Sequence, residues 1–139
     1  MTDWLDQLVG EWTYEGHSVP DDPAQIRTGS ETVTRRGAWV IIDGGDYRFQ
    51  LAVDPETGRV VGDFVHWDYP RFWPYDGVIE DGVLHLGSRG PKFDGSEGET
   101  DYDDIFEVVS PDERRTIGRY VGADGQWVEF CTTTYRRKG

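Results

Sequence analysis

Residues 46–66 read DYRFQLAVDPETGRVVGDFVH, two strand patterns on either side of a turn. Aromatic and aliphatic side chains alternate with other residues along 46–53, which is the period-two pattern of a half-buried strand. Residues 54–58 (Asp-Pro-Glu-Thr-Gly) are typical of a tight turn that ends on glycine. Segment 59–67 then returns with a second strand pattern. The stretch therefore predicts an antiparallel hairpin.

The same strand–turn unit recurs along the chain in both directions. Gly, Pro and Asp turn signals separate about ten short segments that are rich in β-branched and aromatic residues. A flat sheet of that size would expose two long edges, which closure into a barrel removes. We therefore expect one all-β domain over residues 1–139, an antiparallel up-and-down barrel that encloses a small cavity. The predicted strands are 11–18, 29–36, 38–42, 46–53, 59–67, 74–79, 83–88, 99–109, 114–121 and 126–136.

The N-terminus carries the one helical pattern. Residues 3–9 place Trp4, Leu5 and Leu8 on one face, with Thr2 as the expected cap and Gly10 at the end. Because so short a helix is not stable alone, it must dock on another element. We expect it to plug one end of the barrel.

Composition excludes several partners. The 139 residues include 27 Asp and Glu against 14 Lys and Arg, a formal net charge of -13. No basic stripe is available to neutralise nucleic-acid phosphates, and an anionic membrane surface would repel the chain. No apolar run approaches the roughly 20 residues that span a bilayer. The acidic N-terminus does not resemble a signal peptide, and the single cysteine, Cys131, cannot form an internal disulfide, so we expect a cytoplasmic protein.

The order of these motifs resembles a known superfamily. Leu8-Val9-Gly10-Glu11-Trp12, with Gly16 four residues on, is similar to the first strand of the calycins, the lipocalin-like and fatty-acid-binding-protein-like barrels. Nearly the whole chain, in order, further resembles the bacterial family named domain of unknown function 1579. The matching stretches are 29–32 with 39–40, 53–62, 73–77, 84–86 with 90–91, 102–107, and 124–127 leading to 135–137.

That resemblance implies a lipocalin-like barrel and brings no established activity. One residue departs from the pattern: Asp103 stands where a basic residue is expected after Tyr102. An anionic group bound by such a basic residue would be repelled here. The fold alone does not determine a function.

The most aromatic stretch is 66–75, which reads HWDYPRFWPY. Pro70 and Pro74 argue against a regular central strand, so we expect a loop. Two interpretations remain open. The rings form a rim or lid over the barrel mouth and present flat faces to a ligand, or they fill a core that is short of Leu and Met.

Two histidines and one late-strand pair are candidate polar groups. If the strands alternate, His66 and His85 can both point into the barrel, as structural residues, ligand anchors or general bases. Arg119 and Glu129 come close if the last two strands pair about the turn at 122–125. They form either an inward pair that binds a ligand carboxylate or a surface pair that contributes under about 1 kcal/mol.

The sequence lacks the patterns typical of metal, haem, calcium and cysteine-nucleophile sites. The three histidines lack metal-ligand spacing and no Cys/His cluster exists, so no metal is expected. Haem-binding relatives hold iron with a histidine near the chain end, and none follows His85, so no cofactor is expected. Asp101, Asp103 and Asp104 lack the calcium-loop frame and suggest a solvated face or protection of a strand edge. Cys131 has no activating neighbour in the sequence and suggests packing rather than a nucleophile.

We therefore expect a barrel that binds a small apolar or aromatic molecule. Rings supply the contacts, and Arg119 or His66 supplies a polar anchor. No nucleic-acid or membrane partner is expected. The candidate ligand-binding residues are Trp39, His66, Trp73, Tyr75, His85, Arg119 and Glu129.

Two alternatives stay open. One is a cavity enzyme of isomerase, cyclase or hydrolase type that uses His66 or His85 as general base. The other is an interaction module, a homodimer held together through the aromatic residues 67–75. Whether the chain is an enzyme is therefore undecided from the sequence.

Overall fold

The computed structural model describes residues 3–138, which form ten strands and two 3-10 helices. The strands fall close to the predicted segments because each keeps one apolar face. The elements are η1 (Trp4–Leu8), β1 (Gly10–Ser18), η2 (Pro23–Gln25), β2 (Arg27–Arg36), β3 (Trp39–Asp43), β4 (Tyr47–Val53), β5 (Val60–His66), β6 (Tyr69–Glu80), β7 (Val83–Pro91), β8 (Glu99–Ser110), β9 (Glu113–Val121) and β10 (Trp127–Arg137).

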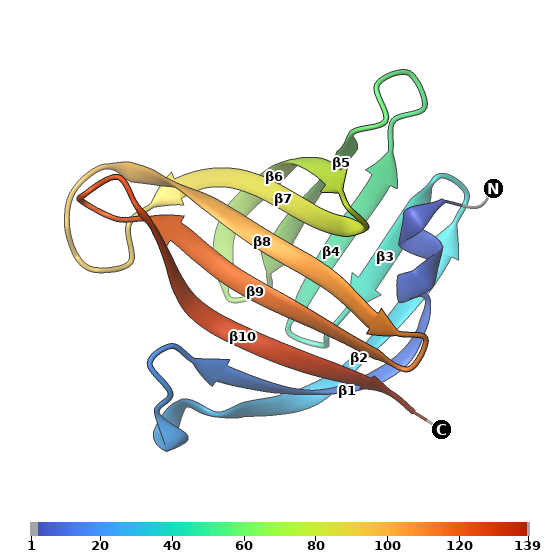
Figure 1. Cartoon of the computed structure of the whole chain (residues 1–139), viewed down its shortest axis with the longest axis horizontal. Coiled ribbons are helices and arrows are strands. Elements are labelled where there is room, and N and C mark those ends of the chain that lie inside the picture. The colour runs from blue at the N-terminus through green and yellow to red at the C-terminus, as the bar shows by residue number, and fades with distance from the viewer. Residues whose placement is uncertain (1–2, 139) are drawn as a thin grey trace.

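The strands close into an antiparallel up-and-down barrel (Figure 1). Each strand pairs with its neighbours in sequence, and β1 pairs with β10 to complete the ring, with Tyr14 opposite Tyr135. Alternate residues point inward, as Leu84 and Leu86 do on β7, where both are fully buried. The prediction of an all-β barrel of about ten antiparallel strands is confirmed.

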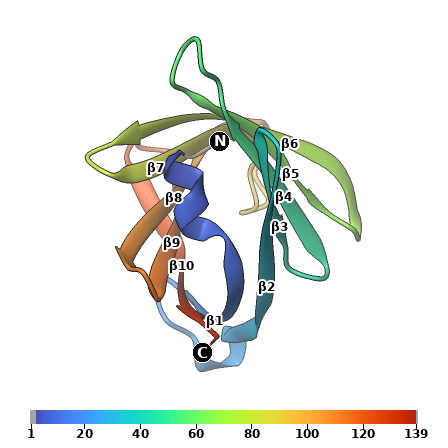
Figure 2. The same ribbon diagram turned by 90° about the vertical axis from the view of Figure 1, so that its right-hand side faces the viewer.

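The N-terminal segment lies across one end of the barrel (Figure 2). The side chain of Asp3 caps η1 by accepting a hydrogen bond from the Leu5 amide, and Leu5 and Leu8 are fully buried in the core. The helix expected over residues 3–9 is wrong in type and length. It is a 3-10 helix of five residues, in which the Asp6 and Val9 amides each donate to the carbonyl three residues earlier, and Val9 is already extended before β1 begins. Thr2, the expected cap, lies outside the described residues.

A buried tryptophan that contacts two arginines lies at this end, which we call the floor. The Trp12 indole N–H donates to the Leu8 carbonyl at 2.8 Å. The guanidinium groups of Arg137 and Arg114 lie 4.3 and 4.8 Å from the Trp12 ring centroid, within reach of cation–π attraction. Arg137 also donates to the Val9 carbonyl at 2.7 Å. The last strand is thereby fastened to the segment that covers the floor.

The aromatic stretch 67–75 is not a loop as expected, because β6 already begins at Tyr69. Pro70 and Pro74 are tolerated since this half of β6 pairs with β5 alone. Pairing of β6 with β7 starts only at Asp76, opposite Gly87. One edge of this half of β6 therefore makes no backbone hydrogen bonds to a neighbouring strand, so a proline there interrupts none.

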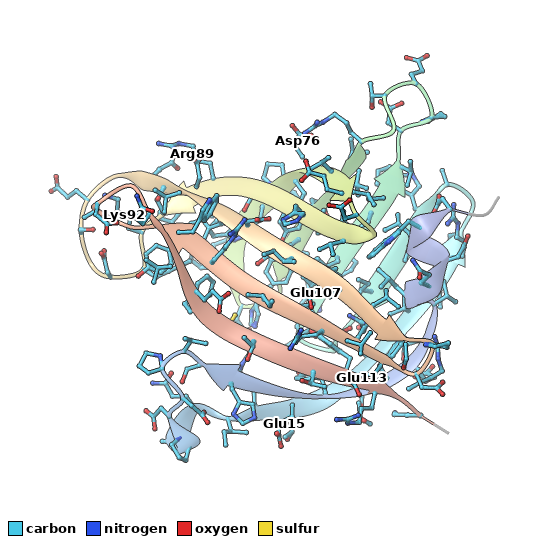
Figure 3. All side chains as sticks on the ribbon, in the orientation of Figure 1. Glu15, Asp76, Arg89, Lys92, Glu107 and Glu113 are labelled. Atoms are coloured by element: carbon cyan, nitrogen blue, oxygen red, sulfur yellow. The ribbon has the colours of Figure 1, made fainter. Side chains whose placement is uncertain are left out.

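Charged side chains cover the outer surface. Figure 3 shows Asp76 and Arg89 projecting away from the barrel wall. Within residues 3–138, no helix is long and apolar enough to cross a membrane.

Candidate functional site

The barrel encloses a cavity of about 740 Å³. It extends from the end opposite η1, which we call the mouth, where Ile26, Asp46 and Phe93 line it, down to Phe106 and Tyr135. Its volume is within the roughly 300–1,000 Å³ usual for small-molecule sites. The chain segments around the mouth are 19–26, 44–46, 67–68, 92–98 and 122–126 (Figure 1).

Five rings from four strands pack together in the middle of the barrel, and we call them the inner cluster. The ring of Phe49 lies at the centre of it. Its centroid is 4.8 Å from that of Phe64, 5.8 Å from that of Phe106 and 6.0 Å from that of Tyr75, with the Tyr75 ring stacked nearly parallel. Tyr47 completes the cluster at 5.9 Å from Phe49. All five line the cavity, which therefore has a wall of flat apolar faces.

A second group of rings, the mouth cluster, lies nearer the opening. Trp73 meets Tyr102 edge to face at 5.6 Å, and Phe93 lies 6.0 Å from Trp73. Phe130 adds a further edge against Tyr102 at 6.4 Å. Trp73 and Tyr102 are buried, whereas Phe93 is 69% exposed. The mouth is therefore apolar on its inner side and open to solvent at its rim.

Trp73 also closes the gap between β6 and β7 that the missing pairing leaves. A Cβ atom at Gly90 would lie only 2.2 Å from Cζ3 of Trp73, so the indole lies directly against the bare backbone of β7. The Arg71 guanidinium covers the same indole at 4.8 Å from its centroid and donates to the Arg89 carbonyl at 3.4 Å. Side chains rather than backbone hydrogen bonds thus hold the wall together here.

A carboxyl group faces the cavity among these rings. Asp104 on β8 lines the cavity, and its Oδ2 accepts a 2.7 Å hydrogen bond from the Tyr75 hydroxyl. Part of its surface faces the cavity, but the group is shielded from bulk water. Burial raises the pKa of Asp104 to about 6, because the charged form loses hydration; the Tyr75 hydrogen bond opposes this shift.

A buried ion pair lies below the inner cluster. Arg114 donates to Glu31, and both side chains are 1% exposed. The Tyr47 hydroxyl donates to the other oxygen of Glu31, and burial raises the pKa of Tyr47 well above its ordinary value. The Arg114 guanidinium also lies 3.9 Å from the Tyr135 ring centroid. This network fixes the lower wall of the cavity in place, and nothing in the sequence pattern indicated it.

Three of the predicted site residues line the cavity: His66, Trp73 and Tyr75. His66 lies at the mouth, where its Nδ1 accepts a hydrogen bond from the Asp68 amide at 3.2 Å. Its Nε2 lies 3.5 Å from Oδ2 of Asp46, which also lines the mouth. The imidazole is thus held on two sides at the entrance, above the inner cluster.

The other predicted polar residues are on the outer wall. His85 Nδ1 lies 3.1 Å from Asp103 Oδ2, and Arg119 donates to that same oxygen through Nε and Nη2 at 3.0 and 2.8 Å. Arg119 also covers the Trp127 ring at 4.4 Å. Asp103, the residue that departs from the family pattern, is therefore the acceptor that organises this outer group.

Trp39 and Glu129 likewise do not line the cavity. Trp39 is 37% exposed on β3, where its neighbour Val40 takes the inward position. Glu129 stands opposite Arg119 in the β9–β10 register as expected, yet the ion pair of Arg119 is with Asp103. The barrel wall thus divides the predicted site residues into two groups. The cavity side has His66, Trp73 and Tyr75, and the outer side has Trp39, His85, Arg119 and Glu129.

Cys131 also lines the cavity, and burial raises the pKa of its thiol. Within residues 3–138, no group of three or more His, Cys, Asp or Glu side chains could hold a metal ion.

The comparisons with known proteins concern the fold and the family. A redesigned beta barrel, b11L5F_LGL, is 13% identical, with 100% of this chain and 98% of that chain covered and a TM-score of 0.47. The structure of EF1p2_mFAP2b bound to DFHBI is 12% identical, with 96% and 95% covered and a TM-score of 0.45. No curated protein matches the chain. The family described as "Protein of unknown function (DUF1579)" matches residues 1–137, and the chain belongs to that family.

Proposed function

We propose that this chain is a binding protein that holds a small apolar or aromatic molecule inside the barrel. The observation that carries the proposal is the cavity of about 740 Å³, walled by the inner and mouth clusters. A protein that needed only stability would gain by filling such a space, because interiors are normally close-packed. A ligand with flat apolar faces would fill it and bury those rings.

Within this proposal, Trp73 and Tyr75 are the ligand-contacting rings from the sequence analysis, and His66 is the polar group at the entrance. Each ring buried against a ligand contributes through its apolar area, at roughly 25 cal/mol per Å² removed from water. Trp39, His85, Arg119 and Glu129 are not part of the proposed site, because they lie on the outer surface. For the same reason, a reaction based on His85 in the cavity is not proposed.

The test is a fluorescence titration with N-phenyl-1-naphthylamine, a neutral aromatic probe that brightens in apolar sites. We expect saturable binding to the parent protein and at least about tenfold weaker binding to Trp73→Ala, since a large buried ring contributes over 1.4 kcal/mol. Trp39→Ala removes the same ring from the outer wall and is the matched control. Circular dichroism melts establish that both variants are folded. Equal binding by folded Trp73→Ala and Trp39→Ala proteins, or no binding by the parent, would refute the proposal.

A second candidate is self-association through the outer side of the aromatic stretch. Among the described residues, Phe93 is the one other ring more than 60% exposed besides Trp67 and Phe72, which are 61% and 72% exposed. We propose that they form a homodimer contact in addition to the cavity. Sedimentation velocity should then show a dimer that Phe72→Asp dissociates, and a parent monomer at micromolar concentration would exclude it.

A further inference from the structure

The inner cavity wall contains a carboxyl group without a cationic partner. Among the residues that the structure describes, two carboxyl groups line the cavity, Asp46 and Asp104. Asp46 lies at the mouth beside His66, where water is available. Asp104 lies on β8 between the inward residues Tyr102 and Phe106, among rings.

One Lys or Arg side chain lines the cavity within residues 3–138: Arg27, which is exposed at the start of β2, next to the mouth segment 19–26. No cation is among the groups that shift the pKa of Asp104. Its neighbours across the sheet are Leu86 on β7 and Gly118 on β9. Within residues 3–138 it takes part in no ion pair, and its one side-chain hydrogen bond is the one that Tyr75 donates to Oδ2.

The other titratable groups near Asp104 do not offset its charge either. The Cys131 thiol faces it from β10, and the electrostatic influence of Asp104 adds to the upward shift of the pKa of that thiol. Asp103, the next residue along β8, is on the outer face and adds a second negative charge. Within residues 3–138, no group donates a hydrogen bond to Oδ1 of Asp104, on a side chain that lines the cavity.

Without a ligand, this environment of Asp104 lowers the free energy of unfolding. An unpaired carboxylate held away from water loses hydration without compensation, and the raised pKa of Asp104 reflects that loss. The cost disappears if a bound molecule brings its own N–H donor or positive charge to Oδ1, since a hydrogen bond between charged groups is among the strongest available. Tyr75 then holds the carboxylate in position from the other side.

The polar groups around the inner cluster discriminate between ligand types. The Tyr75 hydroxyl is committed to Asp104 and the Tyr47 hydroxyl to Glu31. The Arg114 guanidinium is committed to Glu31 and does not line the cavity. At the inner cluster a ligand carboxylate would meet Asp104 and be repelled, whereas an amine would be attracted; the cation of Arg27 lies at the mouth.

We infer that the molecule bound in this cavity carries a protonated amine on an aromatic or apolar body, and that Asp104 binds the amine. The inference rests on the proposed function and adds the charge of the ligand to it. It also predicts that Tyr75 acts on the ligand in two ways, by stacking through its ring and by orienting the carboxylate through its hydroxyl.

The experiment compares three naphthalene probes of one shape by isothermal titration calorimetry at pH 7.5. These are 2-naphthylmethylamine, 2-naphthylmethanol and 2-naphthylacetic acid. At this pH they are cationic, neutral and anionic (the acetate), respectively. We expect the amine to bind at least about tenfold more tightly than the alcohol, since a charge-assisted hydrogen bond contributes more than a neutral one, and the acetate to bind most weakly. Asp104→Asn should reduce the amine preference to less than about threefold while leaving the alcohol affinity nearly unchanged, because the alcohol makes no charge-assisted bond.

The matched control is Asp101→Asn, the same substitution on the same strand. Asp101 is exposed on the outer face, where it pairs with Arg89, so the amine preference should remain. Asparagine at position 104 can still accept the Tyr75 hydrogen bond, which keeps the wall intact. Thermal melts of both variants show whether they are folded.

The outcomes separate the two claims. Saturable binding of the alcohol with no amine preference, or an amine preference that survives Asp104→Asn, overturns the inference and leaves the proposed function standing. Binding of none of the three probes overturns both. Preference for the acetate also overturns the inference, since it would indicate that Arg27 rather than Asp104 selects the charge of the ligand.

Discussion

The Tyr75 hydroxyl on β6 donates a hydrogen bond to Asp104 on β8 at 2.7 Å, reaching past β7, which lies between these strands in the barrel wall. Both side chains line the cavity, and the Tyr75 ring also stacks on Phe49. One residue thus belongs to the apolar wall and fixes its buried carboxyl group. This relationship connects the packing of the barrel to its proposed ligand chemistry.

The buried carboxyl predicts an unusual dependence of stability on pH. The folded-state pKa of Asp104 is about 6, above its ordinary value of 3.8, so between those values the folded state holds more protons than the unfolded state. Its contribution therefore becomes less favourable as pH rises from about 4 to about 6. Asp104→Asn removes this cost and should raise the free energy of unfolding at pH 8 by about 1–3 kcal/mol.

Urea unfolding at pH 8 and at pH 4 measures this effect. The gain from Asp104→Asn should be largest at pH 8 and fall towards zero at pH 4, where the parent carboxyl is protonated in the folded state. A variant that is less stable than the parent at pH 8 would contradict the assignment. Asp101→Asn, on the exposed face, should change stability little at either pH.

The ion pair below the cavity predicts a large loss when broken. Glu31→Gln leaves the Arg114 guanidinium buried without its counter-charge, and we expect the free energy of unfolding to fall by about 3–5 kcal/mol. Glu107→Gln breaks an exposed pair with Arg115 and should cost less than about 1 kcal/mol. Chemical denaturation measures the free energy of unfolding of both variants. Equal losses would mean that the buried pair contributes no more to stability than the exposed one.

The contact of Trp73 with Gly90 predicts that a single methyl group disturbs the wall. Gly90→Ala places Cβ where the indole lies, so the ring must move, at a cost of about 1–3 kcal/mol and with a change in tryptophan emission. Gly87→Ala on the same strand is the control, because its Cβ would meet only the Asp76 carbonyl oxygen at 3.2 Å. A stable Gly90→Ala protein with parent-like emission would show that the indole does not close this gap.

The position of Cys131 in the cavity wall predicts that its thiol is modified slowly. A ligand in the cavity should slow the modification further. Burial raises the pKa of the thiol, so the thiolate that reacts is scarce at pH 7.5. We expect N-ethylmaleimide to modify Cys131 more than about tenfold more slowly than a free thiol, and N-phenyl-1-naphthylamine to slow it again. Mass spectrometry over time gives both rates. Modification that is unaffected by a saturating probe would place the probe outside the cavity.

Much of the fold could be predicted from the sequence because alternation and turn chemistry agree along most of the chain. The hairpin at residues 46–66 lies where the pattern predicted it, with Asp54 and Gly58 in the turn. The start of β6 was missed because Pro70 suggests a loop unless it is known that one strand edge has no partner. Which strand edge lies free is a property of the closed barrel rather than of the local sequence.

The site was less predictable, for two physical reasons. Alternation groups residues by face but does not say which face is inside, so Asp104 was interpreted as solvated although it shares a face with Tyr102 and Phe106. A bulge between Glu129 and Cys131 shifts the register of β10, and Phe130 lines the cavity beside Cys131. Strict alternation cannot anticipate two consecutive cavity-lining residues.

If the cavity binds a small apolar molecule, a bound probe must contact the residues that line it. We would record amide ¹H–¹⁵N spectra during titration with N-phenyl-1-naphthylamine. We expect saturable shifts at cavity residues such as Phe106 and Gly118, with Trp39 and Glu129 on the outer wall unaffected. Shifts confined to the outer wall or to Trp67 and Phe72, or no shifts at all, would contradict binding in the cavity.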